Sequence, residues 1–317
     1  MNFQFARYEF TLTARTALGL PTFAGPTLRG GFGHAFRRLV CVARQPSCQQ
    51  CVLLHHCAYA YLFETRDPAQ PQEEVARPFV LEPPLEHQRE YAPGEPFHFC
   101  LTLFGQATDY LPYFIVAFSL LGQKGLGRKR GKFDLSEVAV VHPLRGEREV
   151  VYEDVTCVLR NILLTVTWEE VQEAAAHLPG DRITLRLLTN TRLVYLSREL
   201  RQEIPFAALV SRLLRRIEAL AARHGKEALT LDRQALINRA KEVETVHSDL
   251  RWQEWFRFSG RQKRRVPLGG LVGTVTYEGN LRPFQPFLLL GQYTHVGKGC
   301  VMGMGKYELV ASEELGN

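Results

Sequence analysis

The chain has 317 residues, of which 45% are hydrophobic, so it is long enough for two domains with substantial cores and is not a disordered chain. Lysine and arginine exceed aspartate and glutamate by 39 − 33 = 6, an excess that favours an anionic partner. No run reaches the roughly 18 to 20 apolar residues that span a bilayer, and the first residues alternate instead of forming a signal peptide, so the sequence predicts a cytoplasmic protein with no membrane partner.

The first half of the chain reads as strand, helix, two strands, helix and strand. Phe3, Phe5 and Phe10 alternate with polar neighbours, which predicts a strand over residues 2–17. Thr27 is suited to cap a helix over residues 28–42, whose apolar side chains recur at three- and four-residue steps. The remaining predicted elements of this half are strands over 78–81, 97–104 and 133–141 and a helix over 110–121.

The second half gives a similar order. Its predicted elements are a strand over 181–194, helices over 205–223 and 231–244, hairpin strands over 252–258 and 271–277, a short helix after Pro286 and a strand over 307–310. The order β, α, β, β, α, β is that of the ferredoxin-like sheet with two helices on one face. The sequence therefore predicts an α+β protein of two tandem ferredoxin-like (RRM-like) domains, 1–145 and 146–317, with a cysteine-rich insertion in the first. Predicted strands over 150–156 and 162–167 join or extend the two halves.

A glycine-rich loop over residues 291–307 is the most distinctive stretch. It holds five glycines together with His295, Lys298 and Lys306, a composition that lets backbone N–H groups approach phosphate closely. Residues 120–133 repeat its outline in weaker form, with Leu-Leu-Gly-Gln, then basic residues, then Gly-Lys and an aromatic residue. The echo indicates a duplicated unit. The glycines can instead be purely structural turns.

The cysteines suggest a metal. An odd number, seven, in a chain without an export signal argues against a disulfide framework. Four of them form the pattern C-x6-C-x2-C-x5-C: Cys41, Cys48, Cys51 and Cys57. Four thiolates around a C-x2-C turn can hold structural zinc or an iron–sulfur cluster, and His55 or His56 could replace one ligand. Ordinary reduced cysteines are the alternative.

Two basic runs are candidates for RNA contact. The first comprises Arg128, Lys129, Arg130 and Lys132, and the second Arg261, Lys263, Arg264 and Arg265. Trp252, Trp255, Phe256 and Phe258 precede the second run and offer rings on which unpaired bases could stack. A basic run is otherwise a solvated face, and aromatic residues are more often part of a core.

Several of these stretches together resemble one family. They are LRGGFGHAFRRLVC over 28–41, GRKRGKF over 127–133, RQKRRVPLGGLVGTVTYEG over 261–279 and THVGKGCVMGMGKYEL over 294–309. The chain is similar to the CRISPR-associated endoribonucleases of the repeat-associated mysterious protein (RAMP) superfamily, which cut repeat-bearing precursor RNA into guide RNAs. The resemblance implies tandem ferredoxin-like domains and metal-independent cleavage by the ribose 2′-hydroxyl, leaving a 2′,3′-cyclic phosphate and a 5′-hydroxyl.

The resemblance also implies roles for residues. The family commonly places its catalytic histidine where His34 lies, and histidine suits proton transfer because it changes charge near neutral pH. His295 is the competing candidate, or else it hydrogen-bonds within its loop. The predicted RNA-binding residues besides the basic runs are Arg37, Arg38, Gly297, Lys298 and Gly299. The family often adds a lysine near its histidine, but no lysine precedes Lys124, so an arginine or a residue from the other domain would have to replace it.

The predicted partners are CRISPR repeat RNA, other CRISPR effector subunits and a second copy in a homodimer. One alternative function is a subunit of the same superfamily that binds guide RNA without cutting it. Another, from a different class, is a redox or regulatory protein whose basic loops bind nucleotide around a cysteine-held cluster.

Overall fold

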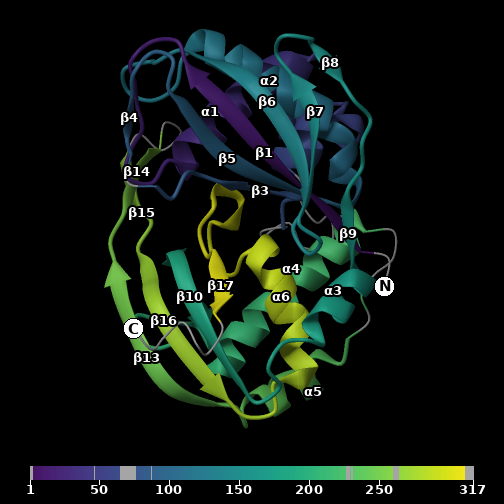
Figure 1. Cartoon of the computed structure of the whole chain (residues 1–317), viewed down its shortest axis with the longest axis vertical. Coiled ribbons are helices and arrows are strands. Elements are labelled where there is room, and N and C mark those ends of the chain that lie inside the picture. The colour runs from purple at the N-terminus through teal and green to yellow at the C-terminus, as the bar shows by residue number, and fades with distance from the viewer. Residues whose placement is uncertain are drawn as a thin grey trace. The chain divides into compact units, whose positions relative to one another are not determined.

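The structure is a computed structural model that describes residues 3–45, 47–64, 76–86, 88–225, 229, 231–259 and 264–310. The chain is α+β and divides into two compact units (Figure 1). The N-terminal unit comprises Phe3–Val166 with His224–Lys226, and the C-terminal unit comprises Thr167–Arg223 with Glu227–Asn317. Among the described residues no helix is long and apolar enough to cross a membrane.

The N-terminal unit is built on one antiparallel sheet in the order β3-β5-β1-β6-β7-β8, with β9 also pairing with β1. Its strands are β1 (Gln4–Ala14), β3 (Phe79–Glu82), β5 (Pro96–Phe104), β6 (Phe133–His142), β7 (Glu147–Glu153), β8 (Val158–Leu159) and β9 (Thr165–Thr167), and its helices are α1 (Gly25–Val40) and α2 (Leu111–Lys124). A two-residue pairing of β2 (Leu18–Gly19) with β4 (Glu90–Tyr91) lies apart from this sheet. The predicted strands and helices over 2–141 are present, with each end within three residues of its predicted place.

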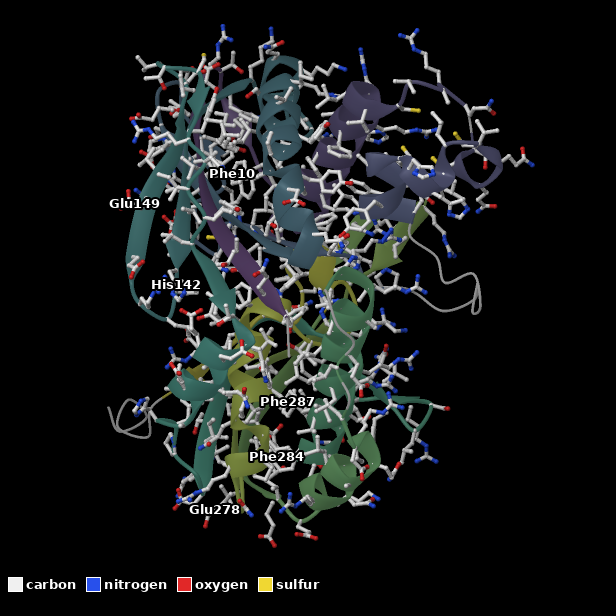
Figure 2. The ribbon with its side chains drawn as sticks, turned by 90° about the vertical axis from the view of Figure 1, so that its right-hand side faces the viewer. Phe10, His142, Glu149, Glu278, Phe284 and Phe287 are labelled. Atoms are coloured by element: carbon white, nitrogen blue, oxygen red, sulfur yellow. The ribbon has the colours of Figure 1, made fainter. Side chains whose placement is uncertain are left out.

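Aromatic side chains join both helices to the same face of this sheet. Phe10 of β1 lies 5.4 Å from Phe118 of α2, and Figure 2 places it inside the unit. Phe32 of α1 stacks on Phe114 and Phe118 with centroids 4.4 and 5.2 Å apart. Because Phe32 and Phe36 are buried, the helical repeat turns position 34 toward solvent.

α1 begins at Gly25, three residues before the predicted start, so Thr27 lies inside the first turn and is not the N-cap. Pro26 explains the difference, because proline fits the first helical turn, where its missing N–H would have no partner in the helix.

The C-terminal unit has a four-stranded antiparallel sheet in the order β13-β16-β10-β17. Its strands are β10 (Arg182–Thr191), β13 (Glu244–Gln253), β16 (Gly270–Glu278) and β17 (Tyr307–Val310), and its helices are α3 (Trp168–Ala175), α4 (Phe206–His224), α5 (Arg233–Ala240) and α6 (Gln285–Thr294). Phe206 packs on Tyr277 and Phe284 at 4.9 and 5.1 Å. Figure 2 shows Phe284 and Phe287 within this packed interior.

The predicted hairpin over 252–258 and 271–277 is wrong in its first strand. β13 ends at Gln253 and pairs with β16, whereas β14 (Phe256–Ser259) pairs with β15 (Arg264–Pro267) as a separate ribbon. β13 is an edge strand whose first six residues are all exposed, so it lacks the apolar alternation from which a strand is predicted.

β7 and β8 pair onto β6 and extend the first sheet. The predicted domain division near residue 145 precedes these strands, and the described units instead divide at Val166 and Thr167.

The two similar stretches, 120–133 and 291–307, share one structural feature, a helical glycine in close contact with the next strand. A Cβ at Gly122 of α2 would lie 2.1 Å from the Phe133 carbonyl oxygen, and one at Gly291 of α6 would lie 1.9 Å from Tyr307 Oη. Both glycines therefore let a helix lie directly against the first residue of the strand that follows it.

Candidate functional site

The exposed face of α1 carries the first candidate group. His34 is exposed, and its side chain makes no hydrogen bond to any residue within the described ranges. Gly30 lies one turn earlier on the same face, and a Cβ built there would meet no atom within 4 Å. The imidazole is therefore adjacent to open space at the backbone of Gly30, where a bulky substrate can approach the helix.

The two arginines after His34 have different surroundings. Arg37 donates from Nη2 to the Gln45 carbonyl oxygen at 2.6 Å, and its guanidinium lies 5.6 Å from the Tyr59 ring centroid. The pKa of Arg37 is raised: burial lowers it, but Cys48, a hydrogen bond to Cys41 and Tyr59 outweigh that effect. Arg38 is exposed and has no polar partner in the part of the chain that the structure describes. Of the two, Arg38 is the one available to a phosphate.

The first basic run forms a tight turn beside α1. Reciprocal backbone hydrogen bonds of 2.8 and 3.0 Å join Leu126 and Gly131, and the four cations of the run are all exposed. A Cβ at Gly31 would lie only 3.1 Å from the Leu126 side chain. The buried Leu126 side chain thus joins the base of the basic turn to the N-terminal half of α1.

The glycine-rich loop, between α6 and β17, has a largely self-contained backbone. Gly297, Gly299, Gly303 and Gly305 all have φ between 71° and 91°, the left-handed region that favours glycine. Gly305 donates to Asn190 at 3.1 Å and Lys298 donates its N–H to Arg192 at 3.0 Å.

At one point of this loop, donors remain that could bind a phosphate. The N–H groups of Gly297 and Gly299 make no hydrogen bond to a described residue, and Lys298 between them is exposed. Two free amides and an ammonium group together suit a phosphate oxygen.

His295 lies at the end of α6, with φ 59° and no exposed surface. Its Nδ1 is 3.0 Å from the Met304 carbonyl oxygen, across the loop. The geometry is that expected if His295 hydrogen-bonds within its own loop, which is the alternative to a catalytic role.

The second basic run is only partly described. Arg261 and Lys263 lie outside the described residues, while Arg264 and Arg265 are exposed on β15. Of the nearby rings Phe256 is 61% exposed.

Trp252 is covered. Arg201 lies over the Trp252 ring at 4.5 Å, so the predicted base-stacking surface of Trp252 is already occupied on one side. The sequence carries no signal for this pairing, because the two residues are distant in the chain.

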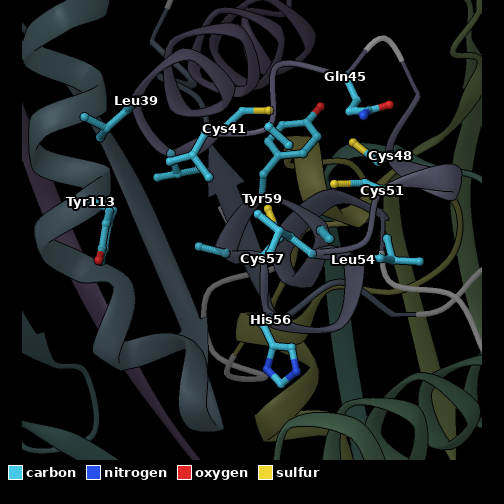
Figure 3. A pocket seen from close by; sticks show the side chains of 16 residues that line it. Leu39, Cys41, Gln45, Cys48, Cys51, Leu54, His56, Cys57, Tyr59 and Tyr113 are labelled. Carbon is cyan, nitrogen blue, oxygen red and sulfur yellow. The ribbon is translucent and has the colours of Figure 1, made fainter.

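The four cysteines of the predicted metal pattern line one cavity of about 380 Å³. Figure 3 shows their sulfur atoms around the Tyr59 ring. Burial raises the pKa of the Cys48 thiol, Arg37 opposes that effect, and Glu64, Cys41 and Cys57 add to it. All four are free thiols. As they stand, however, no three His, Cys, Asp or Glu side chains within the described ranges are grouped so that they could hold a metal ion.

Comparisons with known proteins address both halves. Residues 3–162 match the family model AF_1859_N, described as an N-terminal domain, and residues 185–307 match the model of the CRISPR-associated endoribonuclease Cas6. An uncharacterized protein of Archaeoglobus fulgidus is 29% identical over 143 residues, or 45% of this chain and 47% of that protein. The match thus spans about half the length of that curated relative.

Two solved structures share the fold. Thermus thermophilus Cas6 in a product complex has a TM-score of 0.58 at 16% identity, covering 98% of this chain and 100% of that one. A chain of a partial Cas6–RT–Cas1–Cas2 complex has a TM-score of 0.58 at 15% identity, covering 98% of this chain and 46% of that one. At these identities the likeness concerns the fold alone.

Proposed function

Because this chain belongs to the CRISPR-associated RAMP proteins, with an AF_1859_N domain followed by a Cas6 endoribonuclease domain, we propose that it cuts CRISPR repeat RNA into guide RNAs. The observation that carries this proposal is the exposed His34 beside the open backbone of Gly30.

The proposed reaction is attack of a ribose 2′-oxygen on the adjacent phosphorus. The bond from phosphorus to the 5′ oxygen breaks, so the products are a 2′,3′-cyclic phosphate and a 5′-hydroxyl. A base removes the proton of the 2′-hydroxyl, an acid supplies one to the leaving 5′ oxygen, and cations stabilise the charge on the phosphorane. These steps consist of proton transfer and charge stabilisation, so we propose that they need no metal.

We assign one of the two proton transfers to His34. Arg38 follows it by one helical turn and would contact the phosphate, whereas Arg37 is held by Gln45 and Tyr59. Positioned proton transfer typically contributes about 10²- to 10⁴-fold to a rate.

Binding of the RNA chain would involve cations of each unit. In the N-terminal unit the four cations of the turn at 128–132 are exposed, and the turn is joined to α1 through Leu126. In the C-terminal unit Lys298 lies between two amides that make no hydrogen bond within the described part of the chain. RNA contacts of this kind recognise the phosphate backbone and make affinity dependent on salt.

The fold supports this proposal. In each unit the strand order, from one edge, is second, third, first and fourth: β3-β5-β1-β6 and β13-β16-β10-β17. We interpret both as ferredoxin-like units, with β7 and β8 added to the first. The proposed partners are CRISPR RNA and other CRISPR proteins, since the similar structures include a Cas6 product complex and a Cas6–RT–Cas1–Cas2 complex.

The test incubates repeat RNA with the protein in EDTA and analyses the ends of any product. We expect one cut per repeat and a 5′ fragment whose 3′ end acts as a ligation acceptor only after its cyclic phosphate is opened and the remaining phosphate is removed to leave a 3′-hydroxyl. RNA that is retarded in a gel but stays intact would instead indicate a guide-RNA-binding subunit without catalysis.

A further inference from the structure

The stretch from Cys41 to Tyr59, the cysteine segment, lacks the usual means of staying folded. Of its described residues, 41–45 and 47–59, none is buried. Its regular structure consists of two three-residue turns, Cys48–Gln50 and Leu54–His56, and of Ala58 and Tyr59, which begin the helical stretch that continues to Glu64. Ordering a chain costs conformational entropy, which is normally offset by burial of apolar side chains. Tyr59 packs on Phe36 and Phe63, but the rest of the cysteine segment needs another source of stability.

The four cysteines can supply it. Within the described ranges their thiols line one cavity but are not grouped as a metal site, so an ion would have to draw them together. All four line the same cavity, although they are spread over seventeen positions of the chain. Cys51 donates its N–H to the Cys48 carbonyl oxygen at 3.1 Å, which closes the C-x2-C turn. Such a turn supplies two thiolates from one short loop in many zinc sites. Cys41 follows the last turn of α1, and Cys57 precedes the next helical segment, so the other two thiols come from the two ends of the cysteine segment.

The positive charge of Arg37 also favours a metal ion bound by four thiolates. Four thiolates around one divalent ion carry a net charge of about −2, and Arg37 interacts with both Cys41 and Cys48. The cavity wall is otherwise mostly apolar, with Leu39, Leu54 and Tyr113 among its residues (Figure 3). The Arg37 guanidinium beside the thiols, within apolar walls, would offset the negative charge of such a site.

We propose that Cys41, Cys48, Cys51 and Cys57 bind one structural zinc ion, which holds the cysteine segment against the C-terminal end of α1. Each thiol loses its proton on binding, and the four sulfur atoms close around the ion in tetrahedral geometry. The site has no part in RNA cleavage. It fixes Arg37, and through Arg37 the end of the helix that presents His34 and Arg38.

The test uses the full chain without RNA, so its result does not depend on the proposed nuclease activity. Metal analysis of protein purified without chelators should give about one zinc ion per chain, with sulfur neighbours at about 2.3 Å in X-ray absorption. Cys51→Ser should lower the zinc content at least tenfold. Cys157→Ser is the matched control, because Cys157 is exposed and outside the cysteine segment, and it should keep its zinc.

A second measurement covers the case in which Cys51→Ser misfolds. Arg44 is exposed within the cysteine segment, so stripping zinc from the unmutated chain should open a tryptic site after Arg44, and adding zinc back should close it. Zinc below about a tenth of an ion per chain, or equal zinc in the two serine variants, would overturn the proposal. Iron with a visible absorption band would overturn the zinc assignment in favour of an iron–sulfur cluster.

Discussion

Because the helix face at Gly30 is open, we predict that larger side chains at this position raise the stability of the protein while the largest of them lowers its activity. Glycine within a helix costs roughly 0.5–1 kcal/mol relative to alanine. A Cβ at Gly30 would meet no atom within 4 Å, so no steric penalty offsets that gain. Gly30→Ala should therefore raise the free energy of unfolding by about 0.5–1 kcal/mol, which is about 1–4 °C in Tm for a chain of this size.

A larger side chain at the same position tests the site. Gly30→Met keeps a good helix former but extends into the open space beside His34, so we expect a Tm at or above that of the unmutated protein together with at least a tenfold slower cut. Gln172→Met on α3 is the control, because Gln172 is an exposed helical residue and should change neither quantity. The assays are a thermal melt and single-turnover cleavage of repeat RNA. Full activity in Gly30→Met would refute the claim that RNA approaches the helix at Gly30.

Other variants test other parts of the account. Lys298→Ala should weaken RNA binding and reduce the slope of log Kd against log salt by about 0.7–0.9, one phosphate's worth, whereas Lys241→Ala on the exposed surface should leave the slope unchanged. Gly291→Ala should destabilise the chain by about 1–5 kcal/mol in denaturant unfolding, because a methyl group would displace the buried Tyr307 hydroxyl from its 2.7 Å hydrogen bond to the Leu288 carbonyl oxygen. A wild-type midpoint for Gly291→Ala would mean that α6 does not lie against Tyr307 as described.

Local pattern was sufficient to predict most of the elements. The strand over 307–310 was predicted at its observed bounds, because a short stretch with the apolar ends Tyr307 and Val310 follows the glycine-rich loop. The edge strand β13 was not, since a strand with six exposed residues in succession shows no period of two. The pairing of β14 with β15 depends on contacts across a loop, which periodicity does not encode.

The candidate site was predictable by residue type and less so by environment. Family resemblance singled out His34 and cysteine spacing singled out the four cysteines, and the structure exposes the former and gathers the latter around one cavity. The different surroundings of Arg37 and Arg38, the burial of His295 and the open space at Gly30 all depend on neighbours that are remote in sequence. These could be found only in three dimensions.

The central claim is that His34 transfers a proton during RNA cleavage, and single-turnover cleavage by His34→Ala tests it most directly. His177→Ala is the matched control, since His177 is also exposed and lies beyond α3 in the other unit. We expect His34→Ala to bind repeat RNA with a nearly unchanged Kd but to cut it about 10²- to 10⁴-fold more slowly, a barrier increase of about 2.7–5.4 kcal/mol. Cutting by His34→Ala at the rate of His177→Ala would contradict the account.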